Sequence, residues 1–194
     1  MGVGPDSILA PDPHATIDEM RIVLERPTAR KRPEFLSAVR RSRHLHAPWV
    51  YPPSTPEAFE AYLRRLGMDS RLGYWVSTRD GDLAGVINIS EIVRGTFCSG
   101  YLGYYAFVPH NGCGYMKRGL NAVLTDVFSR HRLHRLEANI QPENASSRGL
   151  AESLGFRLEG FSPRYLKIGG RWRDHERWAI TAEEWKARLR RTIS

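Results

Sequence analysis

The residues best placed to bind a ligand form a short glycine-containing run, His110-Asn111-Gly112-Cys113-Gly114-Tyr115-Met116. A strand-like segment ending at Val108-Pro109 precedes this run, and an amphipathic helix pattern follows it. Glycines at such a junction leave backbone N–H groups free and allow a ligand to approach the main chain. The positive end of the helix dipole then favours an anion such as a phosphate or pyrophosphate. From these residues alone, a tight strand-to-helix connection without a ligand remains the alternative.

A second polar segment lies further along the chain, from Glu143 to Ser147, and it is followed by Leu154-Gly155-Phe156. Asn144 is a favoured residue type at a helix N-cap, and Ser147 follows in the first turn. Gly155 suits the end of the same helix. The segment therefore predicts a strand, a turn, an asparagine-capped helix, a glycine stop and another strand.

Together the two segments resemble the Gcn5-related N-acetyltransferase (GNAT) superfamily, in which the glycine loop holds the pyrophosphate of acetyl-CoA. An Asn-x-x-Ser/Ala element closing with Leu-Gly-Phe follows that loop in the superfamily. Further likenesses at Trp49, in the Tyr101-Leu102-Gly103-Tyr104 strand, at Ile92 to Phe97 and at Gly170 to His175 are to the ribosomal-protein alanine N-acetyltransferases of the RimJ and RimL type. The similarity extends from about residue 20 to residue 185.

The resemblance implies roles for particular residues. It assigns acetyl-CoA binding to Phe107, Val108, Asn111, Gly112, Cys113, Gly114, Tyr115, Met116, Asn144 and Ser147. Backbone donors near Phe107 and Val108 would polarise the thioester carbonyl. Ser147 matches the position of the general acid that protonates the departing thiolate. The alternative for Ser147 is a first-turn serine that only accepts a hydrogen bond from a free N–H.

The general base is harder to identify, because the chain departs from the pattern of many relatives. Ala151 replaces a tyrosine that serves as the acid, and Leu102 replaces a glutamate that serves as the base. The remaining candidates for the base on expected strands are Glu137, which we take as the catalytic partner of Ser147, and Glu91. A glutamate on a strand is also often simply solvated or ion-paired.

Three aromatic residues are candidates for the walls of an acceptor pocket: Trp49, Tyr51 and Tyr104. Aromatic faces accept a peptide terminus without offering a competing charge. Packing in the core is the alternative for Tyr104. Asp174 and His175, at the start of the last expected strand, would orient a substrate or pair with neighbouring arginines.

Length and composition indicate one folded domain at 19–194, preceded by an extension at 1–18 that we expect to be poorly ordered. The sequence has 41% hydrophobic and 26% charged residues, which are ordinary globular values. No apolar run is long enough for a membrane span, and the first residues do not form a signal peptide. Cys98 and Cys113 fit a reducing compartment better than a disulfide scaffold, so we expect a cytoplasmic protein. No pattern of Cys and His has the spacing of a zinc site, so we expect no metal.

The net charge of +8 is compatible with a partner such as RNA, a ribosome or the phosphates of a cofactor, but solvated helix faces would give the same value. Three functions remain open. The first is acetylation of a protein N-terminus, most simply an alanine- or serine-led ribosomal protein. The second is acetylation of a small amine such as an amino acid, polyamine or antibiotic. The third is a basic module that associates with RNA or the ribosome.

Hydrophobic periodicity predicts the elements that position these residues. Helices are expected at 29–45, after Thr55, after Gly114, at 145–154 and from about residue 182. Strands are expected at 21–25, 74–78, 83–93, 97–108, 135–141, 156–168 and 172–180. This order predicts an α+β domain with a mixed, mostly antiparallel sheet flanked by helices. The resemblance adds that the strand ending at Val108 and the strand at 135–141 are splayed apart around the cofactor.

Overall fold

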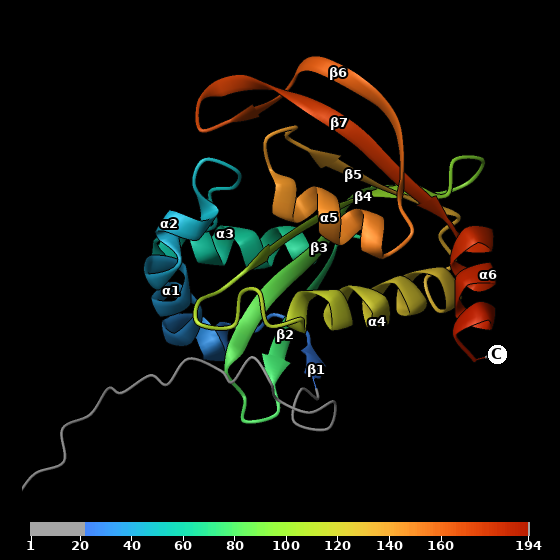
Figure 1. Ribbon diagram of the computed structural model, residues 1–194. Coiled ribbons are helices and arrows are strands. Elements are labelled where there is room, and N and C mark those ends of the chain that lie inside the picture. Colours follow the sequence, from blue (N-terminus) through green and yellow to red (C-terminus); the bar gives the residue numbers. More distant parts are fainter. Residues whose placement is uncertain (1–21, 194) are drawn as a thin grey trace, which may run out of the picture.

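The computed structural model describes residues 22–193, so the expected extension at 1–18 lies outside the described residues. Its centre is a seven-stranded sheet in the order β1-β2-β3-β4-β5-β7-β6 (Figure 1). The strands are β1 (Ile22–Glu25), β2 (Leu72–Thr78), β3 (Leu83–Val93), β4 (Ser99–Ala106), β5 (Arg135–Ile140), β6 (Arg157–Ile168) and β7 (Arg171–Thr181). Within the described chain, β4 and β5 pair in parallel and all other neighbours pair antiparallel, which confirms the mixed sheet.

Helices cover both faces of this sheet. They are η1 (Ala29–Lys31), α1 (Arg32–Arg41), α2 (Arg43–His46), α3 (Pro56–Leu66), α4 (Tyr115–Ser129), α5 (Ala145–Ser153) and α6 (Ala182–Ile193). One buried cluster joins α4 and α5 to the sheet, and a second joins α1 and α3 to its other face. Gly119 brings α4 close to β2, because a Cβ added there would lie 2.5 Å from Cγ2 of Val76.

The strands β4 and β5 part after a short paired stretch. Their pairing covers three residue pairs and ends at Tyr101 opposite Glu137. Beyond this point β4 continues to Ala106 and β5 continues to Ile140 without pairing with each other. We call this open stretch the strand gap. It confirms the expected splay and exposes backbone edges in the middle of the sheet.

The hairpin of β6 and β7 arches over the loop that joins α2 to α3 (Figure 1). Its turn is formed by Gly169 and Gly170, with φ values of 57° and 80°, as expected for glycines at a turn. A Cβ added at Gly169 would lie 2.6 Å from the hydroxyl oxygen of Tyr51, so the loop and the hairpin tip are in contact.

The single helix expected at 29–45 is wrong, because the chain forms η1, α1 and α2 there. The break between α1 and α2 falls at Ser42, whose φ and ψ of −96° and 9° leave the helical region. Ser42 is fully buried, and its Oγ accepts a hydrogen bond of 3.0 Å from the N–H of Val108. This contact ties the start of α2 to the end of β4.

Candidate active site

The edge of β4 that faces the strand gap is set by its register with β3. The N–H of Phe107 donates to the carbonyl of Ala84 at 2.8 Å. Because backbone groups alternate in direction along an antiparallel pair, those of Tyr104 and Ala106 point away from β3 and towards the gap. Nε2 of His46 lies 2.8 Å from the carbonyl oxygen of Ala106 and holds that end of the strand in place.

The two backbone donors anticipated from the sequence, Phe107 and Val108, both have partners within the chain. Phe107 donates to Ala84, and Val108 donates to Ser42. The side chain of Phe107 is fully buried in the core below α1 and α3. The backbone N–H groups that point towards the gap are therefore those of Tyr104 and Ala106, whereas the carbonyl of Ala106 is bound by His46. Their direction depends on strand register, which the residue pattern does not encode.

The glycine loop leads from the end of β4 into α4. Gly112 and Gly114 have φ values of 77° and 82°, and Gly114 is the N-cap of α4. Such a backbone favours glycine, and the first-turn N–H groups of a helix have no partner within it. Asn111, Gly112 and Gly114 are exposed, so this loop presents its main chain to solvent. The arrangement fits an anionic group at the helix N-terminus.

The side chains of Tyr115, Met116 and Cys113, in the predicted loop, are buried or half-buried. Tyr115 and Met116 are buried, and the sulfur of Met116 packs where a Cβ of Gly85 on β3 would lie. Cys113 is half-buried, and its Sγ lies 3.5 Å from the carbonyl oxygen of Asn111. These positions leave the loop backbone as the surface available to a phosphate.

Across the gap from β4, α5 carries the predicted asparagine and serine. Oδ1 of Asn144 accepts a 3.2 Å hydrogen bond from the N–H of Ser147, so Asn144 caps this helix. Oγ of Ser147 lies 2.9 Å from the hydroxyl of Tyr104, and that hydroxyl also donates to the carbonyl of Ser147 at 3.1 Å. Burial raises the pKa of Tyr104 to about 12, although the hydrogen bond to Ser147 acts to lower it. Two protonated hydroxyl groups therefore meet beside the gap.

Neither candidate for the base lies at this hydroxyl pair. Glu137 accepts a 2.8 Å hydrogen bond from Nε of Arg135, in the paired part of β5 opposite Tyr101. Tyr104 lies three residues beyond Tyr101, which corresponds to about 10 Å along a strand. Glu91 is exposed and forms an ion pair of 2.6 Å with Arg71.

Two cavities flank the loop between α2 and α3. One has a volume of about 340 Å³ and joins that loop to the end of β5 and the start of β7. We call it the tryptophan cavity; it is lined by Pro48, Trp49, Gln141, Glu143, Trp172, Arg173 and Asp174. The second has a volume of about 290 Å³ and lies between α3, β3 and β4. We call it the arginine cavity; its polar and aromatic lining includes Tyr51, Tyr62, Arg65, Arg71, Asn88 and Tyr105.

The three predicted acceptor aromatics are thus not together. Trp49 lines the tryptophan cavity, Tyr51 lines the arginine cavity, and Tyr104 contacts Ser147 instead. Sequence reasoning missed Arg65 and Tyr105 as lining residues. The alternating pattern of β4 places Tyr105 on the face opposite Tyr104, and that alternation was the available signal.

The segments that resemble the RimJ type also lie in different parts of the structure. Those containing Trp49 and Trp172 meet at the tryptophan cavity. The segment ending at Phe97, which is 73% exposed, lies at the other end of β4, away from the strand gap.

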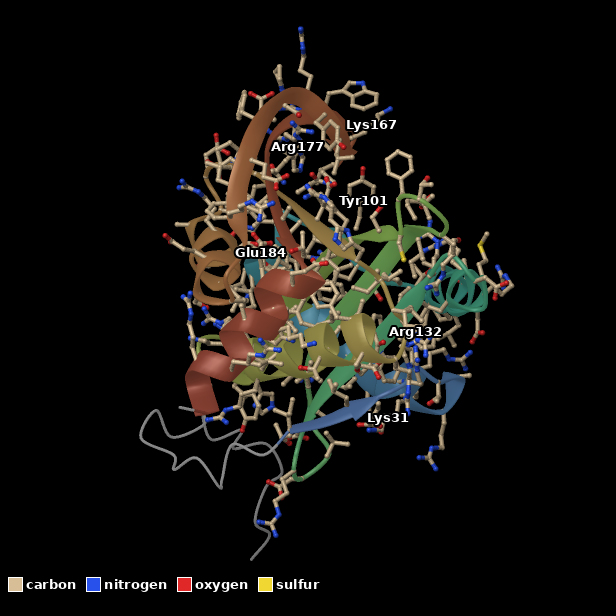
Figure 2. All side chains as sticks on the ribbon, turned by 90° about the vertical axis from the view of Figure 1, so that its right-hand side faces the viewer. Lys31, Tyr101, Arg132, Lys167, Arg177 and Glu184 are labelled. Carbon is tan, nitrogen blue, oxygen red and sulfur yellow. The ribbon has the colours of Figure 1, made fainter. Side chains whose placement is uncertain are left out.

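Asp174 accepts a hydrogen bond from the N–H of Arg164 at 2.7 Å, whereas His175 is buried and burial lowers its pKa. Figure 2 shows Tyr101 below the hairpin strand that carries Arg177.

Within residues 22–193, no group of three or more His, Cys, Asp or Glu side chains could hold a metal ion. Over the same part of the chain, no helix has both the length and the apolar character needed to cross a bilayer.

A sheet that opens beside a glycine loop at a helix start is the fold that the sequence led us to expect of an acyltransferase. Residues 21–157 match the family model described as an acetyltransferase (GNAT) domain, and the chain belongs to this family. It is therefore an N-acetyltransferase.

The similar proteins include enzymes with different acceptors. The [ribosomal protein uS5]-alanine N-acetyltransferase of Escherichia coli is 34% identical over 158 residues, which are 74% of this chain and 79% of that protein. RimJ of Mycobacterium smegmatis, solved in complex with CoA-disulfide, is 29% identical with a TM-score of 0.77, covering 84% of this chain and 83% of its own. Spermidine N-acetyltransferase of Vibrio cholerae, solved with CoA and spermine, shares the fold at 20% identity and a TM-score of 0.73, covering 85% of this chain and 98% of its own.

Proposed function

We propose that this enzyme transfers an acetyl group from acetyl-CoA to the α-amine of a protein N-terminus, with an alanine- or serine-led ribosomal protein as the acceptor. One observation carries the proposal: the Tyr104–Ser147 hydroxyl pair lies beside a strand gap that runs between the glycine loop and the two cavities. The E. coli relative, which is named for acetylating the alanine of uS5, supports this choice of acceptor.

In this proposal the cofactor lies along the edge of β4 and reaches the start of α4. The backbone of Asn111 to Met116 would hold the pyrophosphate, because exposed N–H groups at a helix N-terminus favour an anion. Phe107 and Val108 follow the end of β4 and would lie beneath the pantetheine arm. The backbone N–H groups of Tyr104 and Ala106 would polarise the thioester carbonyl in place of those of Phe107 and Val108.

Proton transfer would involve both sides of the gap. Ser147, held by the Asn144 cap and by Tyr104, would donate a proton to the departing thiolate. Glu137 would accept the proton of the attacking amine only through water, because it is ion-paired with Arg135 and lies in the paired part of β5. An α-amino group, with a pKa of about 8, needs less help than a lysine at about 10.4.

A small polyamine is the second candidate acceptor, and the tryptophan cavity favours it. Trp49 and Trp172 provide aromatic faces there, and the two carboxylates of Glu143 and Asp174 outnumber the one guanidinium, that of Arg173. Such surroundings attract a cation through ring faces and opposite charge. Association with a ribosome through the basic surface would be compatible with either acceptor.

A panel of acceptors tests the proposed function directly. Acetyl-CoA turnover would be measured with a peptide beginning with Ala, the same peptide beginning with Ser, and both with the α-amine blocked and internal lysines kept. Spermidine and an aminoglycoside complete the panel. We expect acetylation of the free N-termini alone. Turnover of spermidine without any peptide product would transfer the assignment to small amines.

A further inference from the structure

We infer that the arginine cavity is a specificity subsite for an acidic side chain close to the N-terminus of the acceptor. This inference rests on the proposed function, since it concerns the part of a peptide that follows the reacting amine. The cavity opens onto β4 at Gly103, the residue next to Tyr104 at the strand gap.

The lining of the arginine cavity is cationic. Arg65 from α3 and Arg71 at the start of β2 both line it, and within the described chain no Asp or Glu does. Arg71 is partly neutralised through its Nη2, which lies 2.6 Å from Glu91. Arg65 is exposed at the end of α3 and carries a guanidinium, whose planar fork of donors matches the geometry of a carboxylate. The cavity therefore favours a carboxylate and disfavours a polyamine.

Two buried polar atoms of lining residues also favour a carboxylate in this cavity. Nε of Arg71 and the hydroxyl of Tyr105 are both buried, and neither has a hydrogen-bond partner within the described structure. An N–H and a phenol O–H can both donate to a carboxylate oxygen. Buried donors without partners are uncommon in folded proteins, and a bound acceptor group would satisfy them.

The position of the cavity sets how far the acidic residue lies from the amine. Gly103 pairs with Asn88 on β3, and Asn88 pairs with Gly73 on β2, close to Arg71. Two strand spacings amount to about 10 Å, which roughly three extended residues would span. The acidic side chain should thus be at position two, three or four of the acceptor. A Cβ added at exposed Gly103 would meet no atom within 4 Å, so the path is open.

The tryptophan cavity provides the contrast within the same molecule. Its charged residues are mixed, because Arg173 lies there beside the carboxylates of Glu143 and Asp174, whereas within the described chain the charged residues that line the arginine cavity are both arginines. An acidic peptide should therefore follow the arginine cavity, on the β4 side of the gap.

The test uses the full-length enzyme and peptides that begin with Ala and carry Glu, Gln or Lys at position two, three or four. We expect kcat/KM to be about tenfold higher for Glu than for Lys at one of these positions, in keeping with a charge-assisted hydrogen bond. In Arg65→Glu this preference should reverse, while the KM for acetyl-CoA stays unchanged. Arg64→Glu is the matched control, because Arg64 is the exposed neighbour on α3 that does not line the cavity.

Each outcome gives a decision. Reversal in Arg65→Glu with an unchanged preference in Arg64→Glu supports the subsite. Equal turnover of the Glu and Lys peptides, or the same change in both variants, overturns it while leaving N-terminal acetylation in place. If no peptide is acetylated at all, the proposed function fails and the subsite fails with it.

Discussion

Tyr104 and Ser147 bring two hydroxyl groups to 2.9 Å from each other at the place where β4 and β5 part. The backbone of Ser147 is fixed by its N–H bond to Asn144 and by the bond from Tyr104 to its carbonyl, and its hydroxyl contacts only Tyr104 among the described residues. A serine hydroxyl is a weak acid, and it becomes useful only when it is positioned next to the atom that needs the proton. In the proposed mechanism, the contact with Tyr104 supplies that positioning.

Replacing Ser147 with alanine should lower kcat by about a hundredfold, because general acid catalysis typically contributes that much or more. Affinity for acetyl-CoA should hardly change and can be measured by calorimetry. The matched control is Ser146→Ala, since Ser146 is the exposed neighbour on the same helix turn. If Ser147→Ala keeps wild-type turnover at saturating substrate, Ser147 is a first-turn residue of α5 and not the general acid.

The pH profile follows from the state of Tyr104. With a pKa raised to about 12 by burial, the phenol stays protonated throughout the working range. The value of kcat/KM should therefore rise between pH 6 and 9, because the α-amine of the acceptor, with a pKa of about 8, loses its proton there. No fall in kcat/KM should follow up to pH 10. A descending limb with an apparent pKa below 10 in kcat/KM would show that another acid controls the reaction.

Glu137→Gln should lower kcat/KM at pH 8 by less than about tenfold, because about half of an α-amine is already neutral there. The ion pair with Arg135 also limits how readily this carboxylate accepts a proton. A loss of more than a hundredfold would instead identify Glu137 as the direct base.

At the scale of the elements, the glycine loop and α4 form the part of the candidate site that the sequence predicts most clearly. Gly114 is needed because its φ of 82° at the N-cap of α4 disfavours a side chain, although a Cβ there would meet no atom within 4 Å. The added carbon would instead project into the space that a phosphate requires.

Gly114→Ala should therefore weaken acetyl-CoA binding by at least about tenfold, because the methyl group obstructs the backbone donors and loss of a hydrogen bond to a charged group costs on the order of 1.5 kcal/mol or more. Calorimetric titration measures this loss. Gly95→Ala is the control, because Gly95 has a φ of 74° and open space around it at the far end of β4. If the two variants bind acetyl-CoA with equal affinity, this loop is not the phosphate-binding site.

Much of the element order was predictable, because local signals specify it. Thr55 caps α3 and Gly169-Gly170 turns the last hairpin, as the residue types indicated. The break at Ser42 was not predictable, because it depends on a hydrogen bond to Val108, which is distant in the sequence. The backbone groups that are free at the gap depend on strand register for the same reason.

At the scale of the whole molecule, the two faces of the sheet carry different parts of the candidate site. The glycine loop and α5 lie with the core cluster on one face, and the arginine cavity lies on the face covered by α3. The strand gap is where a cofactor from one side and an acceptor from the other would meet. The net charge of +8 would speed encounter with a ribosome or an acidic protein, an effect that salt weakens.

The most direct test of this account is the affinity of a bisubstrate analogue, in which CoA is joined through an acetyl bridge to the α-nitrogen of an alanine-led peptide. The analogue should bind at least about a hundredfold more tightly than CoA, because it occupies both sides of the gap at once. A CoA–spermidine conjugate serves as the matched comparison. Binding of the peptide analogue no tighter than CoA, or weaker than the spermidine conjugate, would contradict N-terminal acetylation at the strand gap.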